Sequence, residues 1–321
     1  MRRLIVDAEL RGSLQRQAIA IASEKLRLSP SVEPRLERLE QLMRRSRAIR
    51  DLPTNGRASS APAAFCEYID RRVLSHAFVR GRGIEIGALQ KPLPVSPDTQ
   101  VTYVDWMSKE NLYESYPELR GSNPADVDRI DDGETLSTFE SESQDFIIAN
   151  HFLDHCQDPF QTIKNFLRVL RPGGLIYMAI PDMRRTFDRD RPRTPLSHVV
   201  VDHASGAETS REQHFHEWVT LLESHFGRVY TRERIEARVR ELIARDYSVH
   251  FHTFISDDVH ALIKYCAEVE EMPLSVMFAG EFDEEIIFIV SKLDSSASKT
   301  SCSIQERIEP KKQKRLGEGK H

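Results

Sequence analysis

The stretch that decides the fold is GIEIGALQKPL, residues 83 to 93. Its apolar run contains the acidic residue Glu85, and Gly87 follows two positions later. This order is typical of a buried strand that ends in a tight turn. A nicotinamide cofactor would require the pattern G-x-G-x-x-G, whereas this turn has one glycine and a carboxylate that repels pyrophosphate. The stretch therefore favours a ligand that carries a cationic group.

The composition is that of a globular chain. It has 321 residues, of which 40% are hydrophobic and 30% charged, enough to bury at least one sizeable core. We expect no integral membrane segment, because no run approaches the ~20 apolar residues of a membrane span, and we expect a cytoplasmic location. The four cysteines follow neither a disulfide framework nor a zinc motif.

Charge is unevenly distributed along the chain. Residues 1–50 carry a net charge of +6 and residues 293–321 one of +3, which leaves −14 for the residues between them, since the whole chain has −5. An acidic body repels polyphosphates. The sequence therefore predicts that nucleic acid is not a partner.

The chain divides into four parts by composition. A helical pattern in the basic first part includes Leu36, Leu39 and Leu42, and a segment rich in Pro, Gly, Ser and Asn follows it. The last part is polar and without periodicity, which is typical of disorder. We predict a helical N-terminal extension at 1–50, a linker at 51–64, one large domain at 65–293 and a disordered tail at 294–321.

Short apolar runs alternate with segments of helical length between linker and tail. One such segment, residues 158–174, has Asp158 as the N-cap, Pro159 at the first helical position and a Pro-Gly-Gly stop. A later helix is predicted to begin at the cap Ser256. The alternation predicts a Rossmann-like, doubly wound α/β fold with a mostly parallel sheet. Six runs are expected as strands: GIEIGAL, VTYVDW, DFIIAN, GLIYMAIPD, LSVMFAG and EIIFIVSK.

The expected ligand contains a nucleoside. Asp105 ends the second strand, twenty residues after Glu85, where a carboxylate can accept hydrogen bonds from both hydroxyls of a ribose. The alternative is that Asp105 only caps a turn. S-adenosylmethionine combines a nucleoside with a sulfonium and an α-amino group, so it has the character that the carboxylate at the turn favours.

Five stretches in order resemble the class I S-adenosylmethionine-dependent methyltransferases. They are IEIGA (84–88), YVDW (103–106), DDGETLSTF (131–139), QDFIIANHFLDHCQDP (144–159) and RVLRPGGLIYMAIPD (168–182). The resemblance implies a seven-stranded sheet and S-adenosylmethionine as cofactor. Within the family, the chain is most similar to methyltransferases of bacterial surface-polysaccharide and glycan clusters.

The resemblance also implies the cofactor residues. It assigns the methionine end to Glu85, Gly87 and Ala88, and the ribose to Asp105 with Trp106 beside it. It further assigns the adenine pocket to Asp132 and Gly133, and the methyl position to Asn150 and His151. The chain departs from the family at Leu89, where a second glycine is usual, so the conformation of this turn is open.

The acceptor is expected to bind in an insertion after the fifth strand. Residues 183–252 hold seven of the twelve histidines and are too long for a simple crossover. If REQHFHEW (211–218) is helical, His214 and Glu217 share a face, so the carboxylate would orient the imidazole as a general base. His151 is the second candidate base. The alternative for His214 and Glu217 is that each is an ordinary polar residue on the surface of an amphipathic helix.

No metal site is predicted, although the chain has side chains that could bind a metal. Asp154, His155, His214 and His216 offer carboxylate and imidazole groups, but their spacing matches no fixed metal motif.

The sequence thus predicts a methyltransferase that methylates an oxygen of a glycan or sugar-derived acceptor with S-adenosylmethionine. A methyltransferase of small molecules or quinones is one alternative, and a non-catalytic module that binds S-adenosylmethionine is another. The acceptor identity, the methylated atom and the oligomeric state stay open.

Overall fold

The structure is a computed structural model that describes residues 71–116, 119, 121–222 and 230–294. The helical extension predicted for residues 1–50 and the linker at 51–64 lie outside these ranges. The tail predicted from residue 294 also lies outside them, except for Asp294 itself. None of the described helices is long and apolar enough to cross a membrane.

A single seven-stranded sheet organises the described residues, as predicted. Its strand order is β3-β2-β1-β4-β5-β7-β6. Neighbouring strands from β3 to β5 are parallel, and β7 runs antiparallel to both β5 and β6. The strands are β1 (Arg82–Ile86), β2 (Gln100–Asp105), β3 (Arg129–Ile130), β4 (Gln144–Ile148), β5 (Leu170–Pro181), β6 (Leu274–Phe282) and β7 (Glu285–Lys292).

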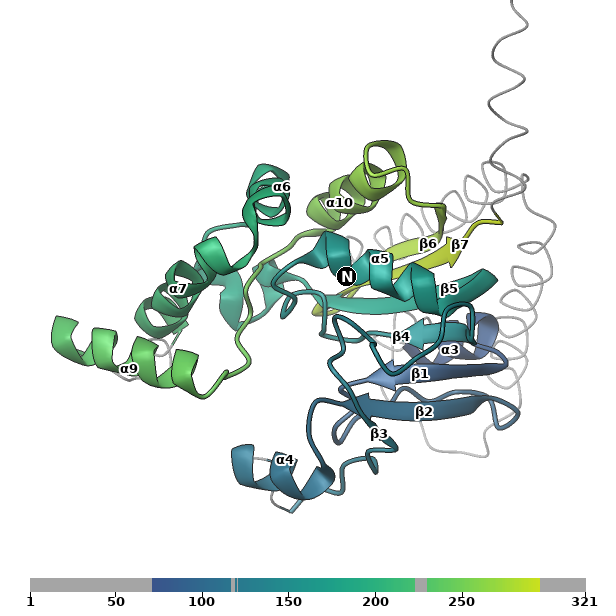
Figure 1. The fold of residues 1–321 in the computed structure, drawn as a ribbon, viewed down its shortest axis with the longest axis horizontal. Helices are drawn as coiled ribbons and strands as arrows, with labels where there is room; N and C mark the ends of the chain where they lie inside the picture. The colour runs from purple at the N-terminus through teal and green to yellow at the C-terminus, as the bar shows by residue number, and fades with distance from the viewer. Residues whose placement is uncertain (1–70, 117–118, 120, 223–229, 295–321) are drawn as a thin grey trace, which may run out of the picture.

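Helices cover the sheet and extend beyond one end of it. Figure 1 shows α6, α7 and α9 grouped together, away from the strands. The helices are α3 (Arg71–Phe78), α4 (Lys109–Ser115), α5 (Pro159–Val169), α6 (Leu196–Ser205), α7 (Glu208–Glu217), α9 (Arg232–Ala244) and α10 (Ser256–Glu268). Short helical turns are η2 (Met183–Arg185), η3 (Phe187–Asp190) and η4 (Trp218–Leu222).

The sheet is buried on both faces, as alternation along β5 shows. Ile176 and Met178 belong to the core that includes residues of α5 and α10, whereas Leu175 and Tyr177 belong to the core that includes residues of α3. Successive side chains of a strand point to opposite faces, so one uniformly apolar strand supplies both cores. This explains why β5 reads as a continuous apolar run.

The segment predicted as an insertion has a hydrophobic core of its own. Phe215 on α7 and Leu242 on α9 are fully buried and pack in one cluster with Val249 and Phe251. Phe254 then bridges to Asp182 at the end of β5. The described residues of α7, η4, α9 and the segment at Val249–Phe251 therefore share a small core, whereas Val199 of α6 belongs to the core of the sheet.

Three local features refine the predictions. Asp158 caps α5 as expected, since its Oδ1 accepts a hydrogen bond from the Gln161 N–H at 2.9 Å. The prediction for Ser256 was wrong by one residue: Ile255 is the N-cap of α10, and the Asp258 carboxylate accepts its N–H at 2.9 Å. The two-residue strand β3 has no hydrophobic run and was not predicted.

Candidate active site

The turn after β1 forms without the second glycine. Gly87 has a φ of 61° and donates its N–H to the Val104 carbonyl at 2.9 Å. Leu89 has a φ of 46°, the left-handed conformation that glycine adopts most easily. Leu89 therefore adopts the backbone conformation that a glycine would favour, and its side chain strains the backbone there. A Cβ built on Gly87 meets no atom within 4 Å, so the turn borders open space.

Glu85 presents a buried carboxylate at this turn. Glu85 is 1% exposed, and its Oε1 accepts the Leu93 N–H at 2.8 Å. Oε2 is buried and has no hydrogen-bond partner among the residues that the structure describes. Burial raises the pKa of Glu85 to about 7, although the Leu93 N–H and the charge of Arg71 oppose this rise. An ammonium group would satisfy Oε2 and favour the ionised form.

A cavity of about 320 Å³ opens in front of Glu85. Asn150 also lines it, with its Oδ1 accepting the Ala179 N–H at 3.1 Å. The Asn150 Nδ2 is a second buried polar atom that lacks a partner within the described ranges. The cavity brings together four predicted cofactor residues and one predicted base: Glu85, Gly87, Ala88, Asn150 and His151.

Asp105 lies at the end of the neighbouring strand β2. Its carboxylate accepts the Trp106 N–H at 2.8 Å and a further backbone hydrogen bond from Met107. Burial raises the pKa of Asp105 to about 6, against the effect of these two bonds. Trp106 is 45% exposed. Both residues stand one strand away from the cavity lining, and the assignment of Asp105 to the ribose stays a prediction.

Two adjacent aspartates after β3 have different roles. Asp131 is buried and accepts hydrogen bonds from both the backbone and the hydroxyl groups of Ser137 and Thr138. Asp132 is exposed, and its Oδ1 accepts the Glu134 N–H at 2.9 Å. Asp131 therefore holds the loop, and Asp132 remains the candidate for the adenine.

Gly133 is required by close packing. A Cβ there would lie 2.6 Å from Ile86 Cγ2 and 2.6 Å from the Phe152 ring. A real Cβ does not approach other atoms this closely, so a side chain would push the loop away from the end of β1. Gly133 thus keeps the predicted adenine loop against the strand that carries Glu85.

His151 is a strained residue on the wall of the cavity. Its φ is 49°, and its N–H donates to the Ala179 carbonyl at 2.7 Å. Its ring Nε2 lies 2.6 Å from Glu285 Oε1, and Arg71 contacts the same carboxylate. Burial would raise the pKa of Glu285, but hydrogen bonds from His151 and Arg71 outweigh it and hold the pKa below its ordinary value. An ionised carboxylate only accepts, so Nε2 carries a proton, and in the neutral ring the free lone pair is then on Nδ1.

Glu285 was missed by the sequence analysis. It is the first residue of β7 and pairs with Pro181, the last residue of β5. Because β7 is antiparallel, its beginning lies at the edge where the parallel strands end. The signal was an acidic pair, Glu284 and Glu285, at the start of a predicted strand; without the strand direction, it reads as an ordinary turn.

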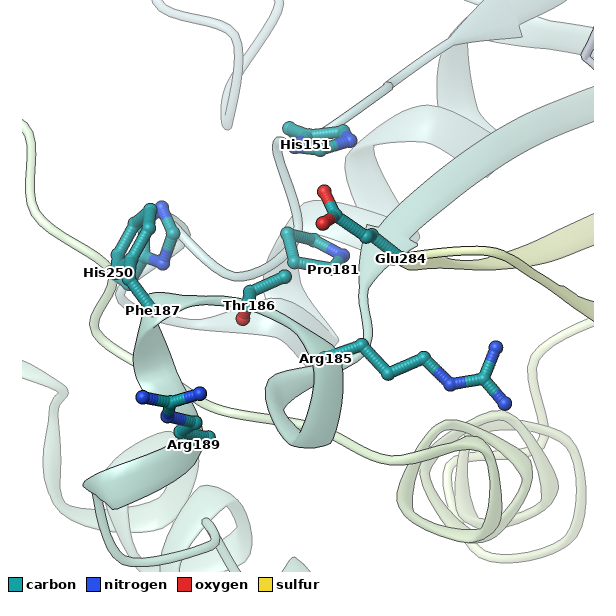
Figure 2. A pocket seen from close by; sticks show the side chains of 8 residues that line it. All are labelled: His151, Pro181, Arg185, Thr186, Phe187, Arg189, His250 and Glu284. Atoms are coloured by element: carbon teal, nitrogen blue, oxygen red, sulfur yellow. The ribbon is translucent and has the colours of Figure 1, made fainter.

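A second cavity of about 440 Å³ shares His151 with the first. Most of its lining comes from the predicted insertion, including Arg185, Phe187, Arg189 and His250. Figure 2 shows Phe187 and His250 together on one side, with His151 and the Glu284 carboxylate on another. The rings of Phe187 and His250 have centroids 5.1 Å apart. The pocket combines charged groups with one aromatic face, and by area its lining is more apolar than polar.

The predicted pair of His214 and Glu217 does not form. Both lie on α7, but Glu217 Oε1 accepts Arg191 Nε at 2.8 Å. His214 is 6% exposed, and its Nε2 lies 3.1 Å from His198 Nε2. Burial, and then the neighbouring His198, lower the pKa of His214 to about 4. His214 is consequently a weak base, and neither residue lines either of the two cavities described above.

Comparison with protein families gives a match to the model described as a methyltransferase domain, over residues 82–178. Among curated proteins, the chain is 30% identical over 156 residues to an uncharacterized 37.1 kDa protein in transposon TN4556 of Streptomyces fradiae. That alignment covers 48% of this chain and 44% of the relative, so the chain spans less than half the length of that protein.

Among solved structures, the chain resembles a SAM-dependent methyltransferase of Methanosarcina mazei, with 16% identity and a TM-score of 0.36. The match covers 67% of this chain and 93% of that one. A Thermotoga maritima structure, described as a possible histamine N-methyltransferase, has 15% identity, a TM-score of 0.36 and coverages of 69% and 93%. Likenesses at this level carry no argument about activity.

The matched segment runs from β1 through most of β5 and contains the turn at Gly87, the Asp105 position and the Asn150–His151 pair. Its buried, unsatisfied Glu85 Oε2 and Asn150 Nδ2 and the open space at Gly87 suit a cofactor with an ammonium group. Residues 82–178 are therefore a methyltransferase domain, and the cofactor that this domain uses is S-adenosylmethionine.

Proposed function

We propose that the whole chain is a methyltransferase that methylates an oxygen of a glycan or sugar-derived acceptor. The observation that carries this proposal is the position of His151. It lines both cavities and is hydrogen-bonded through Nε2 to an ionised Glu285. A general base belongs between the methyl donor and the acceptor hydroxyl, and only a weakly acidic acceptor requires one.

The chain's own residues divide the work of holding the cofactor. Glu85 and Asn150 would hold the methionine end, Asp105 the ribose, and Asp132 the adenine amino group. When bound, S-adenosylmethionine supplies an electrophilic methyl group on a sulfonium. The open space beside Gly87 leaves the backbone of the turn accessible to the cofactor.

His151 would remove the acceptor proton through Nδ1. Glu285 fixes the tautomer with the proton on Nε2 and stabilises the imidazolium that forms, as the carboxylate does in a catalytic triad. Arg71 contacts Glu285 and holds it in place. Glu285 and Arg71 are positioning residues in this scheme, and His151 is the catalytic residue.

The second cavity supports a hydroxylated acceptor over an apolar one. Arg185, Arg189 and Thr186 offer hydrogen-bond donors, and Glu284 offers an acceptor. Phe187 is 36% exposed, and its ring can stack on the apolar face of a sugar. By area the lining is more apolar than polar, so the preference for a hydroxylated acceptor over a quinone-type substrate rests on these polar and charged groups alone. The two arginines further favour an acceptor that carries an anionic group.

The test begins with transfer of a labelled methyl group. Extracts are incubated with the protein and isotopically labelled S-adenosylmethionine, and the labelled product is identified by mass spectrometry. We expect a hydroxylated sugar derivative that gains one methyl group. A labelled quinone or amine would replace the proposed acceptor class, and cofactor binding without any product would favour the non-catalytic module.

The role of the base is tested with His151→Ala. Turnover should fall by roughly 10²–10⁴-fold, the usual contribution of a general base, while calorimetry should show cofactor affinity within about threefold of wild type. The matched control is His216→Ala, which removes a partly exposed histidine that contacts Glu236 on the insertion. Equal turnover in wild type and His151→Ala would remove the base from the proposal.

A further inference from the structure

Three histidines converge inside the predicted insertion. His198 lies on α6, His214 on α7, and His252 on the segment before α10. Each offers one ring nitrogen, and the three nitrogens lie within 4.8 Å of one another. The residues are 16 and 38 positions apart in sequence, which is why no motif spacing revealed the group. The methyl-transfer scheme above uses none of them.

The distances in this group match those between the ligands of a tetrahedral ion. His198 Nε2 lies 3.1 Å from His214 Nε2. The Asp202 Oδ2 atom lies 3.1 Å from His198 Nε2 and 3.8 Å from His214 Nε2. Four ligands at the 2.0–2.1 Å bond lengths of zinc are separated by about 3.3 Å. Small adjustments would therefore place an ion between them.

The three imidazole rings are also arranged edge to face. The interplanar angle is 76° between His198 and His214, 77° between His214 and His252, and 71° between His198 and His252. Stacked rings would direct their nitrogens away from a common point. Rings at these angles can direct one nitrogen each toward a shared centre.

The group leaves buried polar atoms without partners. Both ring nitrogens of His252, which is 1% exposed, have no hydrogen-bond partner in the described part of the chain. Within those ranges His214 Nδ1, in a residue that is 6% exposed, also lacks a partner. Asp202 Oδ2, in a residue that is 2% exposed, accepts no hydrogen bond there and has only the two imidazole nitrogens named above near it. Buried polar groups almost always have hydrogen-bond partners, so several buried atoms without a partner in one place require an explanation. A cation would satisfy the carboxylate oxygen and one nitrogen of His252.

We infer that His198, His214 and His252 bind one zinc-class divalent ion, with Asp202 as the fourth ligand. Imidazole and carboxylate ligands in tetrahedral geometry suit Zn²⁺, and four protein ligands make a closed, structural site. The site joins α6 and α7 to the segment that returns to the sheet. The backbone N–H of His252 donates to the Asp154 carbonyl at 3.0 Å. His250, two residues earlier, lines the second cavity. The ion thus fixes one wall of the proposed acceptor site.

Metal analysis of the full chain tests this inference. Protein purified without chelator, or dialysed against EDTA and then given Zn²⁺, should hold one equivalent of zinc by mass spectrometry. The chelated protein should melt about 5 °C or more below the zinc-loaded protein, because an ion that binds only the folded state stabilises it. Co²⁺ in place of Zn²⁺ should give the strong visible absorption of a tetrahedral site. Less than about 0.1 equivalent of zinc after reconstitution would overturn the inference.

Variants locate the ion. His198→Gln is the mildest change, since this side chain is 27% exposed, and His214→Gln removes a second ligand. The double variant should lose the zinc and the Co²⁺ absorption, while His216→Gln on the same helix should keep both. Circular dichroism of the double variant checks that it folds, and the wild-type Co²⁺ spectrum keeps the test decisive if it does not.

A second group of ligands provides the competing outcome. Asp154, His155 and His250 also place one atom each within 4.8 Å. If His155→Gln loses the zinc while the double variant of His198 and His214 keeps it, the ion binds there and the inference is wrong. If only the double variant loses it, the assignment to His198, His214 and His252 stands.

Discussion

His151 Nε2 and Glu285 Oε1 lie 2.6 Å apart, although 134 positions separate the two residues in sequence. His151 lies in the loop after β4, directly after Asn150, and Glu285 is the first residue of β7. The contact exists because β7 runs antiparallel beside β5, so its beginning lies at the same edge of the sheet as the end of β4. This relationship gives the candidate base both a fixed tautomer and a charged partner.

Replacing Glu285 by Gln should lower turnover about 10–10³-fold and leave KM for the acceptor within about threefold. The amide is neutral and can donate to Nε2, which permits the wrong tautomer of His151 and no longer stabilises the imidazolium. Steady-state kinetics with the identified acceptor measure both constants.

The matched control for this change is Glu284→Gln, which alters the neighbouring carboxylate on the second cavity. It should raise KM more than it lowers kcat. A Glu285→Gln variant with wild-type kcat would show that the contact with His151 has no part in the reaction.

Glu85 should make the free protein less stable as pH rises. Its pKa is about 7 when folded and near 4.5 when exposed, so the folded state holds the proton more firmly. The free energy of unfolding therefore falls as pH rises from about 4.5 to 7, and the loss is complete above 7. Glu85→Gln should be more stable than wild type at pH 8 by about 1–3 kcal/mol and nearly equal at pH 4.5.

Urea unfolding at several pH values measures this difference, with Glu140→Gln as the control because that glutamate is exposed. Calorimetry should show that Glu85→Gln binds S-adenosylmethionine more weakly above pH 7, where the wild-type carboxylate is ionised, and that the difference narrows toward pH 4.5. A stability difference that does not change with pH would contradict the buried, unsatisfied carboxylate.

The two aspartates after β3 should separate stability from cofactor binding. Asp131→Asn weakens four hydrogen bonds to Ser137 and Thr138, so it should lower the free energy of unfolding by about 1–3 kcal/mol. Asp132→Asn should leave the melting temperature unchanged and weaken cofactor binding by about 1 kcal/mol, or roughly fivefold.

Thermal melts and cofactor titrations of the two variants test this directly, since each variant serves as the control of the other. If Asp132→Asn unfolds at a lower temperature while its cofactor affinity stays the same, the adenine assignment is wrong and the residue belongs to the loop's own structure.

The sequence predicted most of the sheet because burial on both faces leaves a strong signal. The six apolar runs correspond to β1, β2, β4, β5, β6 and β7. β3 was missed because two residues that pair at an edge need no apolar run. The cap at Asp158 was predicted correctly since a capping bond depends on local sequence, and Ile255 was missed because the bond there comes from Asp258, three residues later.

Candidate site residues were predictable where a polar side chain or a glycine lies at the end of an apolar strand. Glu85, Gly87 and Asn150 were assigned to the cofactor this way; the structure places them on one cavity, and their role stays a prediction. The pairing of His214 with Glu217 failed because helical spacing permits a contact but does not exclude a stronger one: the Arg191 guanidinium binds Glu217 instead. Glu285 and the three converging histidines depend on long-range packing, which a single sequence does not encode in its spacing.

The position of β7 also has a consequence for the order of folding. β7 is the last of the described strands, yet it lies between β5 and β6 and supplies Glu285. A growing chain can pair β1 to β5 long before this strand is synthesised, and its His151 then has no carboxylate partner from β7. Contacts of such high sequence separation form slowly. Glu285 also lines the methyl-donor cavity, so this cavity and the base beside it are completed together, only when β7 enters the sheet.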